Sequence, residues 1–139
     1  MISLLNSPNP SDSSAAQTDT NEAFRQFVLA HPGRGTLKVQ VTTAGLFPVP
    51  QARVEVTRRF GDTSRLLFKN VTDVSGIANN MVLPALPASY SQTAATARSS
   101  GTEYTVSVYH PSYIPFEMPI SVYDGIETIL PVALEPYVR

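Results

Sequence analysis

The sequence contains no cysteine and no tryptophan among its 139 residues. The absence of cysteine excludes disulfide bonds, thiolate metal sites and cysteine nucleophiles. Charged residues are scarce at 15%, and the formal net charge is -1. Such a chain has no strong field to recruit nucleic acid or an anionic membrane, so we expect no nucleic-acid partner.

Long apolar runs are missing as well. No stretch approaches the length of a membrane-spanning helix, so we expect no membrane insertion. Residues 1–6 lack the basic flank and the apolar run of a signal peptide. We therefore expect no signal peptide and a cytoplasmic or spore-associated protein.

The length favours one domain, which the sequence divides into three parts. Residues 1–20 are expected to form a flexible N-terminal arm, because residues 7–20 hold no large apolar side chain. The arm begins with the apolar residues of Met1–Leu5, which either fray or dock onto a neighbouring subunit. Residues 21–34 are expected to form a short helix and linker, and residues 35–139 a β-sandwich.

The predicted helix covers residues 19–31. Phe24, Phe27 and Val28 follow helical spacing and form one narrow apolar stripe, and Pro32 ends the helix. A helix this short is marginal alone, so the stripe is expected to pack against the sandwich or against a second copy.

From Gly35 onward the apolar residues alternate with polar ones, which is typical of half-buried strands. Tight turns separate the strands, and no strand–helix alternation indicates a parallel sheet. The sequence therefore predicts an all-β, antiparallel, seven-stranded sandwich. The predicted strands are 36–43, 51–59, 65–71, 77–83, 103–109, 114–122 and 126–135.

The strand at 114–122 carries two prolines, Pro115 and Pro119, on one face. Proline cannot donate to a ladder, so this strand is expected at a sheet edge or with a bulge. The opposite face is expected to be buried; it comprises Ile114, Phe116, Met118, Ile120 and Val122.

The turn at residues 72–76 lies between two apolar runs and identifies the fold. Thr72, Asp73 and Gly76 are its defining residues. The Asp73 carboxylate can accept hydrogen bonds from backbone N–H groups of its own turn, and Gly76 can adopt positive φ without strain. These roles concern folding and indicate no catalytic function.

Three segments in order resemble the carboxypeptidase regulatory-like domain, a transthyretin-type sandwich. They are the proline-led segment 48–56 with Ala52, the turn 72–76, and the tyrosine strand 103–108. Segments 83–87, 122–125 and 131–134 further resemble the N-terminal sandwich of clostridial spore cortex-lytic enzymes and their stand-alone relatives. The chain lacks the catalytic portion of such an enzyme, so the resemblance implies an accessory or structural module.

We find no catalytic, cofactor-binding or metal-binding residues in the sequence. His31 and His110 are the only histidines, and two isolated histidines make a poor metal site. No nucleophile elbow, phosphate loop or calcium loop is present. A transthyretin-like hydrolase would need a histidine-rich site, so we do not expect an enzyme and expect no cofactor.

We hypothesise a non-enzymatic structural or assembly module, associated with a spore or an envelope structure. A protein partner or self-association is expected. The alternative is a module that binds carbohydrate or peptidoglycan through the exposed tyrosines and the loop at 84–101, which is either functional or mobile. Sugar sites usually need flat exposed aromatic side chains, and the absence of tryptophan weighs against this alternative. The candidate interaction residues are Met1, Ile2, Leu4, Leu5, Tyr90, Tyr109 and Tyr113.

Overall fold

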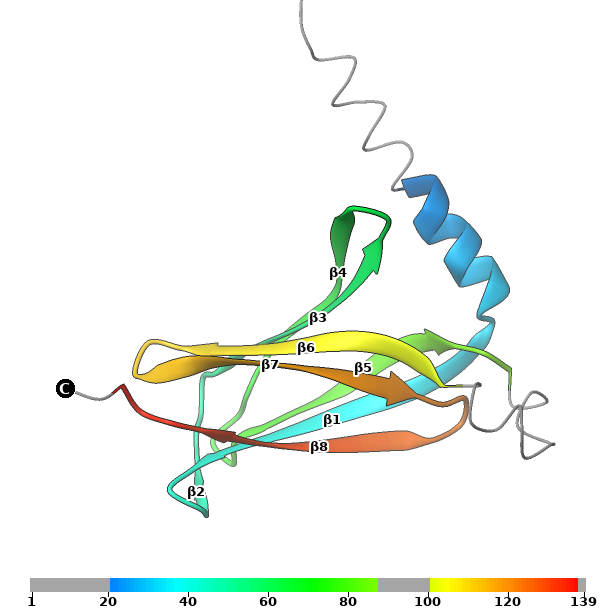
Figure 1. Ribbon diagram of the computed structural model, residues 1–139. Helices are drawn as coiled ribbons and strands as arrows, with labels where there is room; N and C mark the ends of the chain where they lie inside the picture. Colours follow the sequence, from blue (N-terminus) through cyan, green and yellow to red (C-terminus); the bar gives the residue numbers. More distant parts are fainter. Residues whose placement is uncertain (1–20, 88–100, 138–139) are drawn as a thin grey trace, which may run out of the picture.

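Two layers of β-sheet form the body of the protein (Figure 1). The computed structural model describes residues 21–87 and 101–137. A helix at residues 21–30, called the N-terminal helix below, projects from one end of the sheets. The strands are β1 (Gly33–Thr43), β2 (Phe47–Pro48), β3 (Arg53–Phe60), β4 (Thr63–Val71), β5 (Ile77–Ala85), β6 (Thr102–His110), β7 (Tyr113–Val122) and β8 (Glu127–Leu134).

The first sheet is built around β1. This strand pairs with β5 along one edge and with β8 along the other, and β2 continues the β5 side near the end of β1. The second sheet has the order β4-β3-β6-β7, and all of its pairings are antiparallel. The prediction of an all-β, transthyretin-like sandwich with a short helix is confirmed.

The prediction of a wholly antiparallel sandwich was wrong at one pair. β1 and β8 run parallel, from Thr36 beside Glu127 to Thr43 beside Leu134. Alternating burial depends only on which face of a strand meets the core. It is therefore the same for both strand directions, and the sequence pattern of residues 126–135 could not reveal the direction.

The predicted count of seven strands was one short. The additional strand, β2, lies between the predicted strands 36–43 and 51–59 and consists of two residues. It pairs Thr43 with Phe47 and Thr42 with Pro48. So short a strand has no alternation for sequence analysis to detect.

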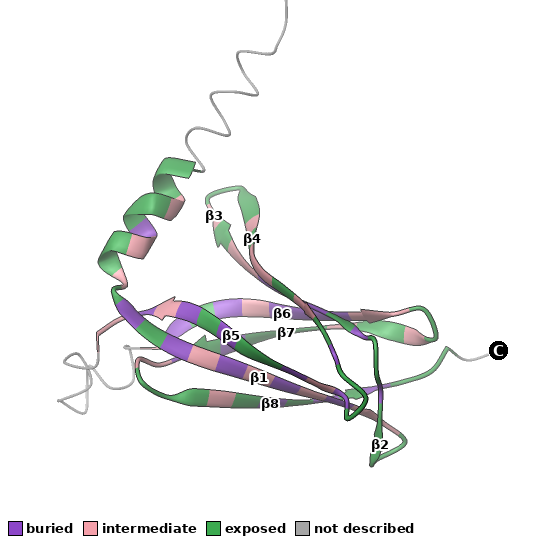
Figure 2. Cartoon of the chain, turned by 180° about the vertical axis from the view of Figure 1, so that it is seen from behind, coloured by how far each residue is buried: buried purple, intermediate pink, exposed green. Residues whose placement is uncertain are grey.

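The core lies between the inner faces of the two sheets (Figure 2). Leu37, Val39 and Val41 of β1 are completely buried. Full burial of each such side chain contributes about 1.5–3 kcal/mol relative to exposure. The second sheet presents a matching set of fully buried valines, Val54 and Val56 from β3 and Val106 and Val108 from β6.

β7 is an outer strand, as its prolines predicted, but only two of the five residues on its expected inner face are buried. Ile120 and Val122 are buried, whereas Ile114 and Met118 are each 42% exposed. The register between β6 and β7 shifts near Pro115, which inserts one extra residue into β7. A bulge of this kind reverses the alternation beyond it, which moves Ile114 out of the predicted inward phase.

The N-terminal helix packs its apolar stripe on the β3–β4 hairpin. The rings of Phe24 and Phe27 meet Phe60 edge-on, with centroid distances of 5.9 and 5.5 Å. The guanidinium carbon of Arg58 lies 4.4 Å from the centroid of Phe27, and that of Arg65 lies 4.1 Å from the centroid of Phe24. Aromatic and cation–π contacts thus attach the helix to its own sandwich.

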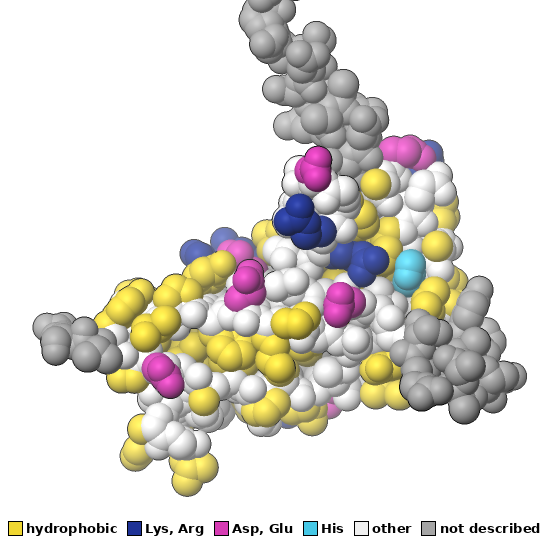
Figure 3. Space-filling view, in the orientation of Figure 1, with side chains coloured by type: hydrophobic (Ala, Val, Ile, Leu, Met, Phe, Trp, Pro, Cys, Tyr) yellow, Lys and Arg dark blue, Asp and Glu magenta, His cyan; other side chains and the backbone are white. Residues whose placement is uncertain are grey.

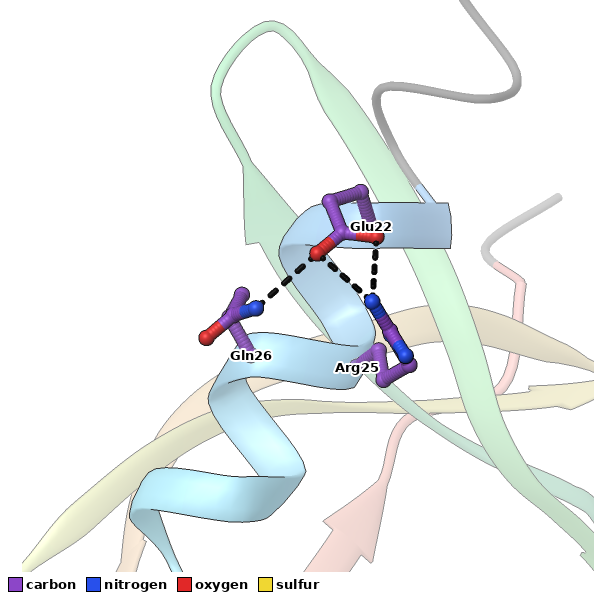
Figure 4. A network of polar contacts seen from close by, with 3 residues as sticks. All are labelled: Glu22, Arg25 and Gln26. Carbon is purple, nitrogen blue, oxygen red and sulfur yellow. Dashed lines mark hydrogen bonds and ion pairs between the residues drawn. The ribbon is translucent and has the colours of Figure 1, made fainter.

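Polar contacts support the exposed side of the same helix (Figure 4). Nη2 of Arg25 donates to both carboxylate oxygens of Glu22 at 3.0 and 3.1 Å, and Nε2 of Gln26 donates to Oε2 at 2.9 Å. The hydrogen bond from Gln26, followed by the contacts with Arg25, lowers the pKa of Glu22.

Within the described residues, no helix is long and apolar enough to cross a membrane.

Tyr104 connects the core to the edge of the first sheet. Its side chain is 1% exposed, and its hydroxyl donates to the carbonyl oxygen of Pro84 at 2.5 Å. Burial raises the pKa of Tyr104 above its ordinary value of 10.0. The folded protein therefore holds the phenolic proton more tightly than the unfolded chain does.

We predict that Tyr104→Phe lowers the free energy of unfolding by about 1–2 kcal/mol at neutral pH, because the Pro84 carbonyl loses its donor. The contribution of the hydroxyl is complete below the unfolded pKa of 10.0 and is lost as the pH rises through the higher folded pKa. Urea titrations should therefore show the difference between wild type and variant shrinking above about pH 10. A difference that stays constant there would contradict the raised pKa.

Candidate interaction surface

The turn at residues 72–76 is held by its own polar atoms, as predicted. Oδ1 of Asp73 accepts hydrogen bonds from the backbone N–H groups of Ser75 at 2.8 Å and Ile77 at 3.0 Å. The N–H of Gly76 donates to the Asp73 carbonyl at 2.9 Å, and Gly76 has a φ of 77°. The carboxylate thus holds the backbone of its own turn in place.

Thr72 ties this turn to the segment before β3. Its hydroxyl oxygen accepts from the N–H of Ala52 at 2.8 Å and donates to the carbonyl of Val49 at 2.7 Å. Both Thr72 and Ala52 are buried. A buried hydroxyl satisfied in both roles holds two loops in one relative position.

Gly76 fixes the turn against β1. The N–H of Val41 donates to the Gly76 carbonyl at 2.7 Å, and the N–H of Val49 donates to the Val41 carbonyl at 3.0 Å. A Cβ on Gly76 would overlap the carbonyl oxygen of Val41 and lie 3.1 Å from the nitrogen of Val49. Only glycine therefore combines positive φ with this close approach.

Large apolar side chains project from this scaffold into solvent. Leu46, Phe47 and Val74 are 87%, 68% and 85% exposed. Figure 3 shows apolar side chains projecting at the lower left, over the β1–β2 turn. Leu46 and Val74 line one groove of about 310 Å³, whose other lining residues are Gln40, Thr42, Pro48, Ser75 and Ile77. We call Leu46, Phe47, Pro48, Val74 and Ile77 the turn-end surface.

The turn-end surface carries almost no charge. The sequence has no Asp, Glu, Lys or Arg between Lys38 and Arg53. The Asp73 carboxylate beside Val74 is exposed, and its Oδ1 accepts hydrogen bonds from two backbone N–H groups. An exposed apolar patch with so little charge can be desolvated at low cost, which is a property of protein interaction sites.

The predicted Tyr109 and Tyr113 lie on either side of the β6–β7 turn, but they do not form one surface. Tyr109 lines a groove of about 400 Å³ with Tyr137 and other residues, whereas Tyr113 packs edge-on against His110 at a centroid distance of 5.1 Å. The guanidinium carbon of Arg53 lies 4.7 Å from the centroid of Tyr109 and covers that ring. The other predicted interaction residues, Met1, Ile2, Leu4, Leu5 and Tyr90, lie outside the described residues.

Sequence analysis missed Leu46, Phe47 and Val74. Leu46 and Phe47 are consecutive apolar residues inside a turn with no flanking charge, where polar residues are the rule. That pair was a usable signal. The exposure of Val74 could not be inferred in the same way, because it depends on how the two turns meet.

Acidic and histidine side chains are dispersed across the described structure. Among residues 21–87 and 101–137, no three His, Asp or Glu side chains are close enough to hold a metal ion. The turn end offers a groove and exposed apolar area, and the polar side chains of Thr72 and Asp73 hold the backbone beneath it.

Comparisons with known proteins identify the fold. No protein-family model and no curated protein matches the sequence. Solved structures similar to this chain include the Bacillus anthracis TIE protein (TM-score 0.51, 18% identity), GBS52, the minor pilin of Streptococcus agalactiae (0.51, 10%), and transthyretin from Sparus aurata (0.50, 16%). The alignments cover 75%, 77% and 73% of this chain.

The same alignments cover 17% of the TIE protein, 46% of the pilin and 90% of transthyretin. This chain thus spans less than half of the first two proteins. At sequence identities this low, the similarity to these structures shows that the chain has a transthyretin-like β-sandwich fold. It does not show the function of the chain. An enzyme is also among the solved chains with this fold, so the fold leaves activity open.

We predict that Gly76→Ala lowers the free energy of unfolding by at least about 3 kcal/mol, because it adds a steric overlap to the cost of positive φ. Gly61→Ala is the matched control. Gly61 has a φ of 66°, and no atom lies within 4 Å of the position that a Cβ would take there, so this change should cost only about 1 kcal/mol. Equal losses in chemical denaturation would show that the contact with β1 is unimportant.

Proposed function

We propose that this chain is a non-catalytic assembly module that associates with further copies of itself through the turn-end surface. The observation that carries the proposal is the exposure of Leu46 and Val74, 87% and 85%, around one groove. Burial of such side chains at an interface removes apolar area from water and favours association.

The scaffold beneath the surface supports this proposal. Thr72 and Asp73 hold the turn through hydrogen bonds, and Gly76 joins it to β1. A surface that is rigid before binding loses little conformational entropy when it binds. The turn end therefore combines apolar area with preorganisation.

An envelope or spore structure is the setting that we propose for the assembly. The sequence resemblance to the sandwich of spore cortex-lytic enzymes suggests this setting. One solved chain with the same fold is a minor pilin, which is compatible with a module of this kind. The fold alone does not distinguish this role from others.

We predict that the double variant Leu46→Asp with Val74→Asp weakens self-association at least about tenfold, because two charges would have to be desolvated in the interface. Light scattering after size exclusion, over a range of concentrations, measures the effect. Ile126→Asp is the matched control: Ile126 is 55% exposed in the β7–β8 turn, at the other end of the sheets (Figure 1).

A wild-type chain that stays monomeric at every concentration would contradict self-association. Equal weakening by Ile126→Asp would remove the assignment to the turn end. Deletion of residues 1–20 separates any contribution of the N-terminal arm, since every residue that defines the turn-end surface lies between 46 and 77.

The second candidate function is binding of carbohydrate or peptidoglycan. The groove of about 400 Å³ favours it, because two tyrosines, Tyr109 and Tyr137, line it beside the polar side chains of Gln51 and His110. The position of the Arg53 guanidinium over the Tyr109 ring weighs against carbohydrate binding, since sugars stack on open aromatic faces.

If this groove binds peptidoglycan, the double variant Tyr109→Ala with Tyr137→Ala should lose most of the retention on purified peptidoglycan in a sedimentation assay. The variant Leu46→Asp with Val74→Asp should be retained like wild type. No retention of the wild-type chain would dismiss the glycan function.

A further inference from the structure

β4 is an outer strand of the second sheet. Among the strands of the described residues, it pairs with β3. Within the described part of the chain, no strand pairs with its outer side. β5 of the facing sheet meets only the far end of β4, where Nδ2 of Asn70 donates to the carbonyl of Asn79 at 3.0 Å. An open strand of this kind presents unpaired backbone groups that can accept another strand.

The other outer strands are protected against such pairing. β7 contains Pro115 and Pro119, and β8 contains Pro131. Proline has no N–H and therefore interrupts any added ladder. β5 carries an irregularity at Asn80, which has a φ of 63°, and ends with Pro84 near its last residue. β4 contains no proline over its nine residues.

The hairpin register shows which backbone groups of β4 face outward. A two-residue turn joins Phe60 to Thr63, and in such hairpins the flanking pair exchanges hydrogen bonds. The direction alternates from Thr63 to Leu66, beyond which a bulge at Leu67 shifts the register, so the N–H and C=O groups of Ser64 and Leu66 point away from β3. Both residues are exposed, Leu66 at 48%.

The β3–β4 hairpin is the basic part of an otherwise acidic chain. Residues 53–71 contain five Lys or Arg and two Asp or Glu, whereas the whole chain has a net charge of -1. Arg59 and Lys69 are exposed, and among the described residues neither has an ion-pair partner. These two charges lie on neighbouring strands beside the open backbone groups.

We infer that β4 accepts an extended, acidic segment of a partner protein as an additional strand of the second sheet. The backbone groups of Ser64 and Leu66 would pair with the segment, and Arg59 and Lys69 would select acidic side chains. The same charges disfavour pairing between the β4 strands of two copies, because like charges would approach each other. This surface is separate from the turn end and does not depend on the proposed self-association.

Nuclear magnetic resonance of the ¹⁵N-labelled full chain tests the inference with defined peptides. The probe is the capped heptapeptide Glu-Val-Glu-Val-Glu-Val-Glu. It should shift the amide signals of Ser64 and Leu66 and those of neighbouring β4 residues. Glu-Pro-Glu-Pro-Glu-Pro-Glu keeps the charge but cannot form a ladder, and Lys-Val-Lys-Val-Lys-Val-Lys reverses the charge. Neither control peptide should produce these shifts.

The double variant Arg59→Glu with Lys69→Glu leaves the β4 backbone intact and reverses the selecting charges. It should bind the glutamate peptide at least about tenfold more weakly and should prefer the lysine peptide. The inference would be overturned if no β4 amide shifts, if the proline peptide acts like the valine peptide, or if the shifts lie on β7 or β8. An unchanged preference of the variant would equally refute the role of Arg59 and Lys69.

Discussion

Val41 is the residue on which both the core and the candidate surface depend. Its side chain is fully buried, and in β1 it lies beside Val132 of the parallel strand β8. Its N–H donates a hydrogen bond to the carbonyl of Gly76, and its carbonyl accepts a hydrogen bond from the N–H of Val49. One strand position therefore packs the sandwich and fixes both turns that carry Leu46 and Val74. Buried backbone groups must be paired, so a displacement of either turn would leave Val41 unsatisfied.

Predictions from the sequence were most successful where apolar and polar residues alternate regularly along a whole strand. The alternation along residues 36–43 correctly placed Leu37, Val39 and Val41 in the core. It failed where geometry depends on a partner, as in the direction of β8 beside β1 and in the bulge that turned Ile114 outward. The turn at 72–76 was predictable because its hydrogen bonds are local.

The candidate surface was only partly predictable for the same reason. Tyr109 was among the predicted interaction residues, yet no local pattern indicates that Arg53, far away in the chain, covers its ring. Leu46 and Phe47 could have been found as apolar residues in a turn, whereas Val74 becomes part of a surface only because it lies beside Leu46 in one groove. The turn-end surface forms where two turns distant in the sequence lie side by side, so the pattern of either segment alone does not reveal it.

The distribution of proline separates two modes of recognition on this sandwich. Pro115, Pro119 and Pro131 prevent strand addition at β7 and β8, so any partner there must be recognised by side chains. β4 lacks proline but carries Arg65 and Lys69, and charge on an open strand is the other common defence against unwanted pairing. Charge differs from proline in that a partner of opposite sign can overcome it. β4 is defended by charge and by a bulge at Leu67 but not by proline, and it is therefore the strand at which pairing can be selective.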